Sequence, residues 1–180
     1  MSARARAAAT ALAIYVAAIV AANVMTDALG LVPVGFGLMV TAGTYAAGFA
    51  LLARDFVHRY GGIRLVLLGI AAGAAISWFA ASPALAVAST VAFTTAEMAD
   101  LLVFTPIRRH GFARAALASN VVSAPVDTFA FLAIAGFPIA APVVLGQLVG
   151  KLLWATILPL ALYVGGRRAV LRQPVHAGGA

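Results

Sequence analysis

The feature that most constrains this chain is a series of six long apolar segments that contain few charges. A segment of about 20 apolar residues is long enough to cross the hydrocarbon core of a bilayer as an α-helix. Of the 180 residues, 64% are hydrophobic and only 9% are charged, whereas soluble domains carry about 25% charged residues. The sequence therefore predicts an all-α integral membrane bundle of six transmembrane helices. The expected spans are residues 7–29, 35–53, 64–82, 84–104, 115–137 and 142–164.

Basic residues alternate with these spans. The turns around Gly30, Ser82 and Pro138 contain no lysine or arginine, while the other two turns and the two ends of the chain are arginine-rich. Because basic loops stay in the cytoplasm, we expect both termini to be cytoplasmic and the protein to be multi-pass in the cell (inner) membrane. Eleven of the twelve basic residues follow this pattern: Arg4, Arg6, Arg54, Arg59, Arg64, Arg108, Arg109, Arg114, Arg167, Arg168 and Arg172.

The topology also explains the net charge of +7. A nucleic-acid role is not expected, since it needs a basic face on a soluble fold. The chain has no cysteine, which excludes disulfides and thiolate metal sites, and we expect no cofactor and no metal.

The N-terminal segment resembles a signal peptide in its basic start and apolar run. The run is long enough to span a membrane, so we interpret it as a retained first helix. Two regions are expected: a six-helix transmembrane domain over residues 1–166 and a disordered cytoplasmic tail over residues 167–180.

Polar and charged residues recur inside the last three spans. A carboxylate near the bilayer centre costs roughly 2.5 to 3.5 kcal/mol, so such residues usually face the bundle interior, a partner or a water-filled cavity. They come in pairs spaced three, seven or four residues apart, which puts both members on one face of a helix. The pairs are Glu97 with Asp100, Asn120 with Asp127, and Gln147 with Lys151.

The depth of these residues in the membrane predicts one shared site. A rise of about 1.5 Å per residue places Glu97, Asp127 and Lys151 within about 5 Å of the midplane. The same arithmetic places Asp100 and Asn120 about 9 Å toward the cytoplasm. We therefore expect one cation and three acids around a single cavity.

Structural roles are open beside a binding role. Lys151 paired with Glu97 or Asp127 is also the pattern of an ion pair that fixes helix register, and buried carboxamides often hold helices together. Whether Asn23 and Asp27 of the first span join the site is open. Asp55, in the arginine-rich turn after the second span, is expected to be solvated.

Catalysis is not expected. The chain has no H-E-x-x-H and no G-x-S-x-G motif, and its three histidines fall in loops or in the tail. A dyad of Glu97 and Asp127 would need one neutral acid, whereas a neighbouring lysine keeps both ionised. Carboxylates, carboxamides and a cation at the midplane of a helical bundle instead suit a transporter of a small polar molecule.

Four ordered motifs carry a resemblance to a known family. They are RDFVHRYGG, AEMADLLVF, SNVVSAPVDTFAFLAIAGF and GQLVGKLLW, which together extend over roughly residues 40 to 165. In these blocks the chain resembles the queuosine-precursor transporters, also called the VUT family. The resemblance implies import of 7-cyano-7-deazaguanine or a related 7-deazapurine.

The chemistry of such a substrate agrees with the polar residues. A guanine-like edge offers adjacent N–H donors to a carboxylate and a carbonyl to a lysine or an amide, and an aromatic side chain such as Phe129 or Trp154 can stack on the ring. Trp154 follows Lys151 by three residues and is expected to face the same cavity. The expected substrate-binding residues are Glu97, Asp100, Asn120, Asp127, Phe129, Gln147, Lys151 and Trp154.

Two alternatives stay open from the sequence. Six short helices would also suit a substrate-binding membrane subunit that needs an energising partner. The second alternative is a non-transporting membrane assembly protein, in which the polar stripes only hold helices together. The coupling ion, proton or sodium, and the oligomeric state are open as well.

Overall fold

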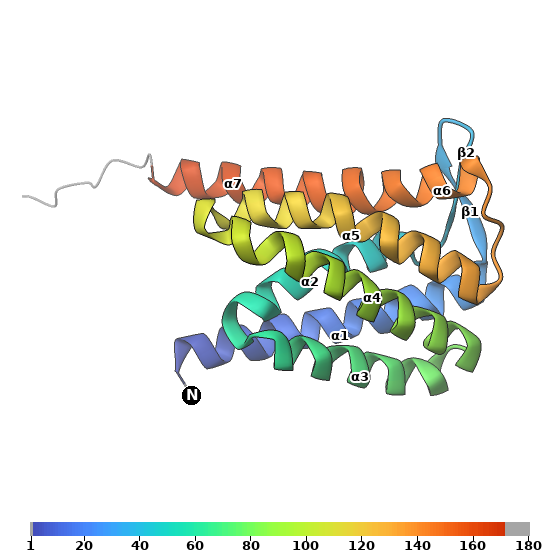
Figure 1. The fold of residues 1–180 in the computed structure, drawn as a ribbon, viewed down its shortest axis with the longest axis horizontal. Helices are drawn as coiled ribbons and strands as arrows, with labels where there is room; N and C mark the ends of the chain where they lie inside the picture. The colour runs from blue at the N-terminus through green and yellow to red at the C-terminus, as the bar shows by residue number, and fades with distance from the viewer. Residues whose placement is uncertain (1, 172–180) are drawn as a thin grey trace, which may run out of the picture.

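The computed structural model describes residues 2–171 as a bundle of long helices with a small β-hairpin at one end (Figure 1). The helices run back and forth along the long axis of the bundle, as expected for a chain of membrane spans. The elements are α1 (Ala3–Leu29), β1 (Leu31–Gly35), β2 (Leu38–Thr41), α2 (Thr44–Gly61), α3 (Ile63–Ala80), α4 (Pro83–Ile107), η1 (Arg108–His110), α5 (Phe112–Ala135), α6 (Ala141–Leu148), η2 (Val149–Ile157) and α7 (Leu158–Leu171).

The prediction of a helical membrane protein is confirmed at this coarse level. Five helical segments of the described chain are long and apolar enough to cross a membrane: Ala3–Leu29, Ile63–Ala80, Pro83–His110, Phe112–Ala135 and Ala141–Gly166. The last of these joins α6, η2 and α7 into one rod. Its helix continues to Leu171, beyond the boundary expected at residue 166, and the rest of the expected tail, 172–180, lies outside the described residues.

The start expected for the second span, at residue 35, is wrong, although residues 44–53 are helical. Its first part belongs to an antiparallel hairpin in which β1 pairs with β2, and α2 begins only at Thr44. The tip of the hairpin has positive φ at Gly35, Phe36 and Gly37, a conformation that glycine adopts without steric cost. Valines on both strands favour extended backbone, so this apolar run is strand and turn, not helix.

The turn expected at RDFVHRYGG is also displaced. These residues continue α2 to Gly61, and the helix ends at Gly62, which has φ +76°. Arg54 and Asp55 are therefore inside the bundle and only 2% and 1% exposed. The expectation that Asp55 is solvated is wrong, while Arg59 at the end of the helix is exposed.

Small residues allow the helices to pack closely. A Cβ added at Gly69 or Gly73 of α3 would lie 2.7 Å from Tyr15 or 2.8 Å from Ile19 of α1. Close backbone approach at glycine and alanine is typical of helix packing in membranes. Tyr15 and Ile19 belong to the main hydrophobic core, which lies between α1, α2 and α3 and reaches α4 and α5.

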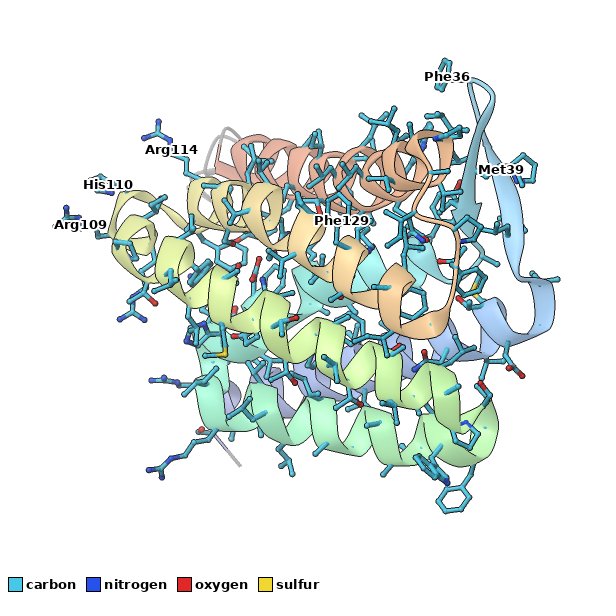
Figure 2. The ribbon with its side chains drawn as sticks, turned by 45° about the vertical axis from the view of Figure 1, so that its right-hand side comes forward. Phe36, Met39, Arg109, His110, Arg114 and Phe129 are labelled. Carbon is cyan, nitrogen blue, oxygen red and sulfur yellow. The ribbon has the colours of Figure 1, made fainter. Side chains whose placement is uncertain are left out.

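The two ends of the bundle differ in character. The N-terminus, the α2–α3 and α4–α5 junctions and the end of α7 lie at one end (Figure 1). Arg109, His110 and Arg114 project from that end, whereas the hairpin tip with Phe36 projects from the other (Figure 2). The alternation of basic and uncharged turns in the sequence thus corresponds to two opposite ends of the bundle.

Candidate functional site

Lys151 lies inside the bundle and is paired with a carboxylate of α5. Its side chain is 2% exposed, and Nζ donates to Asp127 Oδ2 at 2.7 Å and to Thr128 Oγ1 at 2.9 Å. The ammonium and the carboxylate are thus both buried and both hydrogen-bonded. Such a pair is stable as a unit, but removing one member leaves an uncompensated buried charge.

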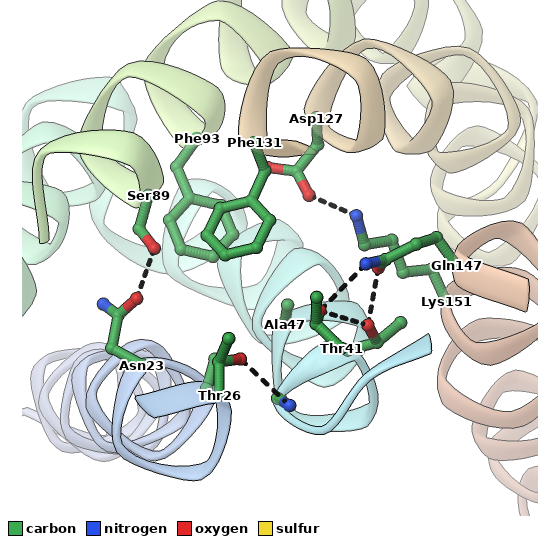
Figure 3. A pocket seen from close by; sticks show the side chains of 13 residues that line it. Asn23, Thr26, Thr41, Ala47, Ser89, Phe93, Asp127, Phe131, Gln147 and Lys151 are labelled. Atoms are coloured by element: carbon green, nitrogen blue, oxygen red, sulfur yellow. Dashed lines mark hydrogen bonds and ion pairs between the residues drawn. The ribbon is translucent and has the colours of Figure 1, made fainter. Parts of the chain in front are cut away.

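The Lys151–Asp127 pair lines a pocket close to the hairpin (Figure 3). The space open to the centre of a water-sized sphere is only about 20 Å³, close to what a single water needs. The described conformation is therefore too tight for a bicyclic ring. The lining residues are Ala22, Asn23, Thr26, Thr41, Gly43, Thr44, Ala47, Ser89, Phe93, Asp127, Phe131, Gln147 and Lys151.

A small hydrogen-bond network ties the hairpin to the helices at this pocket. The amide Nε2 of Gln147 donates to Thr41 Oγ1 at 2.8 Å, and the Thr44 hydroxyl donates to Gln147 Oε1. The α6 backbone approaches β2 closely here, since a Cβ on Gly146 would lie 2.0 Å from the Met39 carbonyl oxygen. The hairpin thus forms one wall of the pocket.

The first helix also contributes to the pocket. Asn23 lines it, donates from Nδ2 to Ser77 Oγ at 2.9 Å and accepts from the Ser89 hydroxyl. Asp27, one turn farther along α1, is exposed. Of the two polar residues of α1 whose role was open, Asn23 is placed at the pocket and Asp27 is not.

A second buried ionic cluster is centred on Arg54 of α2, which we call the Arg54 cluster. Nη1 lies 3.0 Å from Glu97 Oε2, and Nη2 lies 2.7 Å from Asp100 Oδ1 and 2.9 Å from Asp55 Oδ1. Nη2 also donates to Asn120 Oδ1 at 3.3 Å. All five side chains are buried.

The expectation of one cation and three acids around a single cavity is wrong in this respect. Glu97 and Asp100 pair with Arg54, whereas Lys151 pairs with Asp127. The sequence reading missed Arg54 because the arginine-rich motif was placed in a turn. A signal was present, since two carboxylates buried on α4 require a cation.

A chain of hydrogen bonds joins the Arg54 cluster to the backbone of Lys151. Asn120 Nδ2 donates to Thr156 Oγ1 at 3.4 Å, and the Thr156 hydroxyl donates to the Lys151 carbonyl at 2.9 Å. Lys151 and Thr156 lie in the π-helical segment η2. Such segments occur often at functional sites.

The two aromatic residues expected to stack on substrate lie elsewhere. Phe129 and Trp154 are 49% and 46% exposed, and neither lines the pocket. Figure 2 shows Phe129 on the outer surface of α5. In a π-helix the repeat is i to i+5, so a residue three positions after Lys151 turns away from its face.

The rings at the pocket are Phe93 of α4 and Phe131 of α5 (Figure 3). They were missed, although each lies four residues from an acid that the sequence reading selected, Phe93 from Glu97 and Phe131 from Asp127. That spacing puts ring and acid on neighbouring turns of one helical face.

Comparison with known proteins identifies a protein family. No curated protein and no solved structure matches the chain. A family model described as "Putative vitamin uptake transporter" matches residues 5–165, a range that includes the pocket and the Arg54 cluster. The match is consistent with the resemblance to the queuosine-precursor transporters. The chain belongs to the vitamin uptake transporter family that this model describes.

Proposed function

We propose that the protein imports a queuosine precursor, 7-cyano-7-deazaguanine or a related 7-deazapurine, and that the pocket at Lys151 binds it. The family supports uptake as the activity. The observation that carries the choice of site is the buried Lys151–Asp127 pair inside a pocket that also presents a carboxamide and two aromatic rings.

The proposed contacts follow from the chemistry of each lining group. The Asp127 carboxylate accepts hydrogen bonds from the ring N–H and exocyclic amine of a guanine-like edge, and Lys151 donates to its carbonyl. Gln147 offers both a donor and an acceptor. Phe93 and Phe131 supply ring faces for stacking.

The ion pair has a role in the empty state as well. Without substrate, Lys151 and Asp127 satisfy each other, so neither charge is left unpaired in the bundle. Substrate binding replaces part of that contact with hydrogen bonds of similar kind. The pocket has room for about one water, so it must widen before substrate can bind. We expect it to widen at the hairpin end, where the hairpin forms one wall of the pocket.

The topology proposed for this activity has six crossings, with both termini cytoplasmic. The arginine-rich end lies in the cytoplasm of the cell according to the positive-inside rule, and the hairpin faces outside. In this arrangement α2 is the polar crossing, and its Arg54 is paired with acids inside the bundle. Reporter fusions at Gly30, Ser82 and Pro138 should read outside, and those at Gly61 and Gly111 inside.

The test is uptake of labelled 7-cyano-7-deazaguanine by a host that cannot synthesise queuosine. The wild-type protein should support uptake, and Asp127→Asn should abolish it while the protein still inserts in the membrane. Asp27→Asn is the matched control, because the same chemical change falls on an exposed carboxylate. Normal uptake by Asp127→Asn would contradict the proposed site, and no uptake by well-expressed wild-type protein would contradict the proposed function.

A further inference from the structure

We infer that Glu97 and Asp100 form a proton-binding site, separate from the substrate pocket, through which a proton gradient drives uptake. This inference rests on the proposed function. Its starting point is the arrangement of charges in the Arg54 cluster.

The Arg54 cluster has more acids than cations. Arg54 hydrogen-bonds Asp55 at 2.9 Å, and these two residues form one neutral pair. Glu97 and Asp100 remain as a formal surplus of two negative charges, at 2% and 1% side-chain exposure. A surplus of this kind in a bundle interior is relieved when a carboxylate takes up a proton.

Hydrogen bonding around these two acids is incomplete. Among the described residues, Glu97 Oε1 and Asp100 Oδ2 have no hydrogen-bond donor, and the other oxygen of each acid contacts only the guanidinium, at 3.0 Å for Glu97 Oε2 and 2.7 Å for Asp100 Oδ1. The two acids are three residues apart on one face of α4, one turn from each other. A proton on Glu97 creates an O–H group that can donate a hydrogen bond to the Asp100 carboxylate.

An unpartnered side chain outside the acids supports a proton route. Ser123 of α5 is fully buried, and its hydroxyl has no hydrogen-bond partner in the described part of the chain. It follows Asn120 by three residues and precedes Asp127 by four, so it lies on the same helical face between the two clusters. A hydroxyl both accepts and donates, which suits a proton relay.

The geometry favours a proton over a sodium ion. The guanidinium already occupies the centre of the cluster, at 2.7 to 3.0 Å from all three acids. A metal cation of this kind needs several oxygen ligands around it and room for itself. A proton needs one carboxyl oxygen and no additional space.

The hydrogen-bond chain described above connects this site to the substrate pocket. Arg54 bonds Asn120, Asn120 bonds Thr156, and Thr156 bonds the carbonyl of Lys151. Along α5, Asn120 and Asp127 are seven residues or about 10.5 Å apart. A change in the charge around Arg54 can therefore reach Lys151 through contacts that already exist.

Other titratable groups near the cluster come from several elements. The Tyr15 hydroxyl of α1 is close enough to interact with Arg54, Glu97 and Asp55. His58, one turn after Arg54 on α2, interacts with Asp100, Arg54 and Arg108. Lys151 and Asp127 form their own closed pair. Asp55 also has one unfilled acceptor, Oδ2, but its Oδ1 accepts a hydrogen bond from Arg54, whereas Glu97 and Asp100 are the acids in formal excess.

The proposed cycle moves one proton with each substrate. The Glu97 carboxylate takes up a proton from the outer side and becomes a carboxylic acid, which donates a hydrogen bond to Asp100 while substrate is bound. The acid releases the same proton on the cytoplasmic side, which restores the carboxylate. The pair cannot drive uptake if both of its members stay ionised throughout.

The experiment uses purified protein in liposomes with the membrane potential clamped. An inward gradient of one pH unit is tenfold in proton concentration, so one-to-one coupling should accumulate labelled 7-cyano-7-deazaguanine up to about tenfold. Glu97→Gln should bring substrate only to equal concentrations on both sides. Asp27→Asn, an exposed carboxylate, should keep the wild-type accumulation.

Each contrary result has a separate meaning. Accumulation that ignores the pH gradient, that follows an imposed sodium gradient, or that stays tenfold in Glu97→Gln would overturn the inference. Wild-type liposomes that neither bind nor take up the substrate would instead overturn the proposed function.

A second measurement does not depend on transport or on the stability of the variant. The infrared spectrum of wild-type protein at neutral pH should contain the carbonyl band of a protonated carboxylic acid. That band should disappear as the pH is raised, and it should be unchanged in Asp27→Asn. Absence of the band in wild-type protein at every pH tested near neutrality would overturn the proton site.

Discussion

The described part of the bundle contains two buried ionic sites, and they compensate buried charge in different ways. Lys151 and Asp127 are matched one to one and hydrogen-bonded, and they line a pocket. In the Arg54 cluster a single guanidinium faces three acids, and each acid has a carboxyl oxygen without a hydrogen-bond donor among the described residues. A balanced pair is suited to exchange its partner for a ligand, whereas an unbalanced cluster is suited to gain and lose a proton.

The two sites should also differ in how much their cations contribute to the stability of the fold. In the Arg54 cluster three acids share one cation, so loss of Arg54 leaves all three unpaired. In the other site, loss of Lys151 leaves only Asp127 unpaired. Removing one partner of a buried ion pair costs about 3 to 5 kcal/mol. Substitutions can therefore rank the two sites by how much of the fold each cation supports.

The largest effect is expected for Arg54→Met. It leaves three buried carboxylates without a cation, so destabilisation should reach or exceed about 5 kcal/mol and little folded protein should accumulate. Fluorescence-detected size exclusion of membrane extracts measures the folded fraction. Arg109→Met is the control, because Arg109 is exposed at the arginine-rich end. A normal folded yield for Arg54→Met would remove the proposed difference between the sites.

A smaller loss of stability, about 3 kcal/mol, is expected for Lys151→Met, because it leaves a single carboxylate unpaired. Combining it with Asp127→Asn should recover folding, since replacing a whole buried pair is often neutral. Uptake should not recover, because both groups contact substrate in the proposed function. Thermal unfolding and uptake of the double variant decide this, and full transport would reduce the pair to a structural ion pair.

The hairpin wall is tested by Gly146→Ala. The added Cβ would lie 2.0 Å from the Met39 carbonyl oxygen, and overpacking of this kind costs about 1 to 3 kcal/mol. We expect a lower melting temperature and weaker substrate binding, because β2 must move away from the pocket. Gly165→Ala, with no atom within 4 Å of the new Cβ, should be neutral or slightly stabilising. Equal melting temperatures for the two variants would refute the close contact.

The smallest effect is expected for Thr44→Val at the pocket. It removes a neutral hydrogen bond to Gln147, which contributes about 1 kcal/mol, or roughly a fivefold change in affinity. Equilibrium binding of 7-cyano-7-deazaguanine measures the change. Thr95→Val, whose hydroxyl bonds carbonyls of its own helix, should leave affinity unaltered. If Thr44→Val lost as much affinity as Asp127→Asn, the charge of Asp127 would not be the main determinant of binding.

The helical pattern of the chain could be predicted because apolar length alone identifies a span. The start of the second span could not, since Leu38, Met39 and Val40 are as apolar in a strand as in a helix. Its hairpin depends on backbone conformation at Gly35 and Gly37 and on packing against α6, and hydropathy reports neither.

Of the residues that line the pocket, the sequence predicted Asp127, Gln147 and Lys151, but it did not predict the cation that pairs with Glu97 and Asp100. The spacing of Gln147 and Lys151 put both at the pocket, as the sequence suggested. The partner of Glu97 could not be predicted, because Arg54 resembles a loop arginine in the sequence, whereas its side chain reaches Glu97 and Asp100 of α4 in the structure. The outward turn of Trp154 follows from the π-helix, whose local repeat has no signature in composition.

Direct binding of 7-cyano-7-deazaguanine to purified protein tests the division of labour between the two sites. Calorimetric titration of the wild type, Asp127→Asn and Glu97→Gln, each checked for monodispersity, gives three affinities under one condition. We predict that Asp127→Asn weakens binding by about a hundredfold or more, equivalent to the loss of a charged hydrogen-bonding partner. The affinity of Glu97→Gln should stay within about threefold of the wild-type affinity at a pH where Glu97 of the wild type is protonated. Unchanged affinity in Asp127→Asn, or a hundredfold loss in Glu97→Gln alone, would contradict the assignment of substrate to the Lys151 pocket.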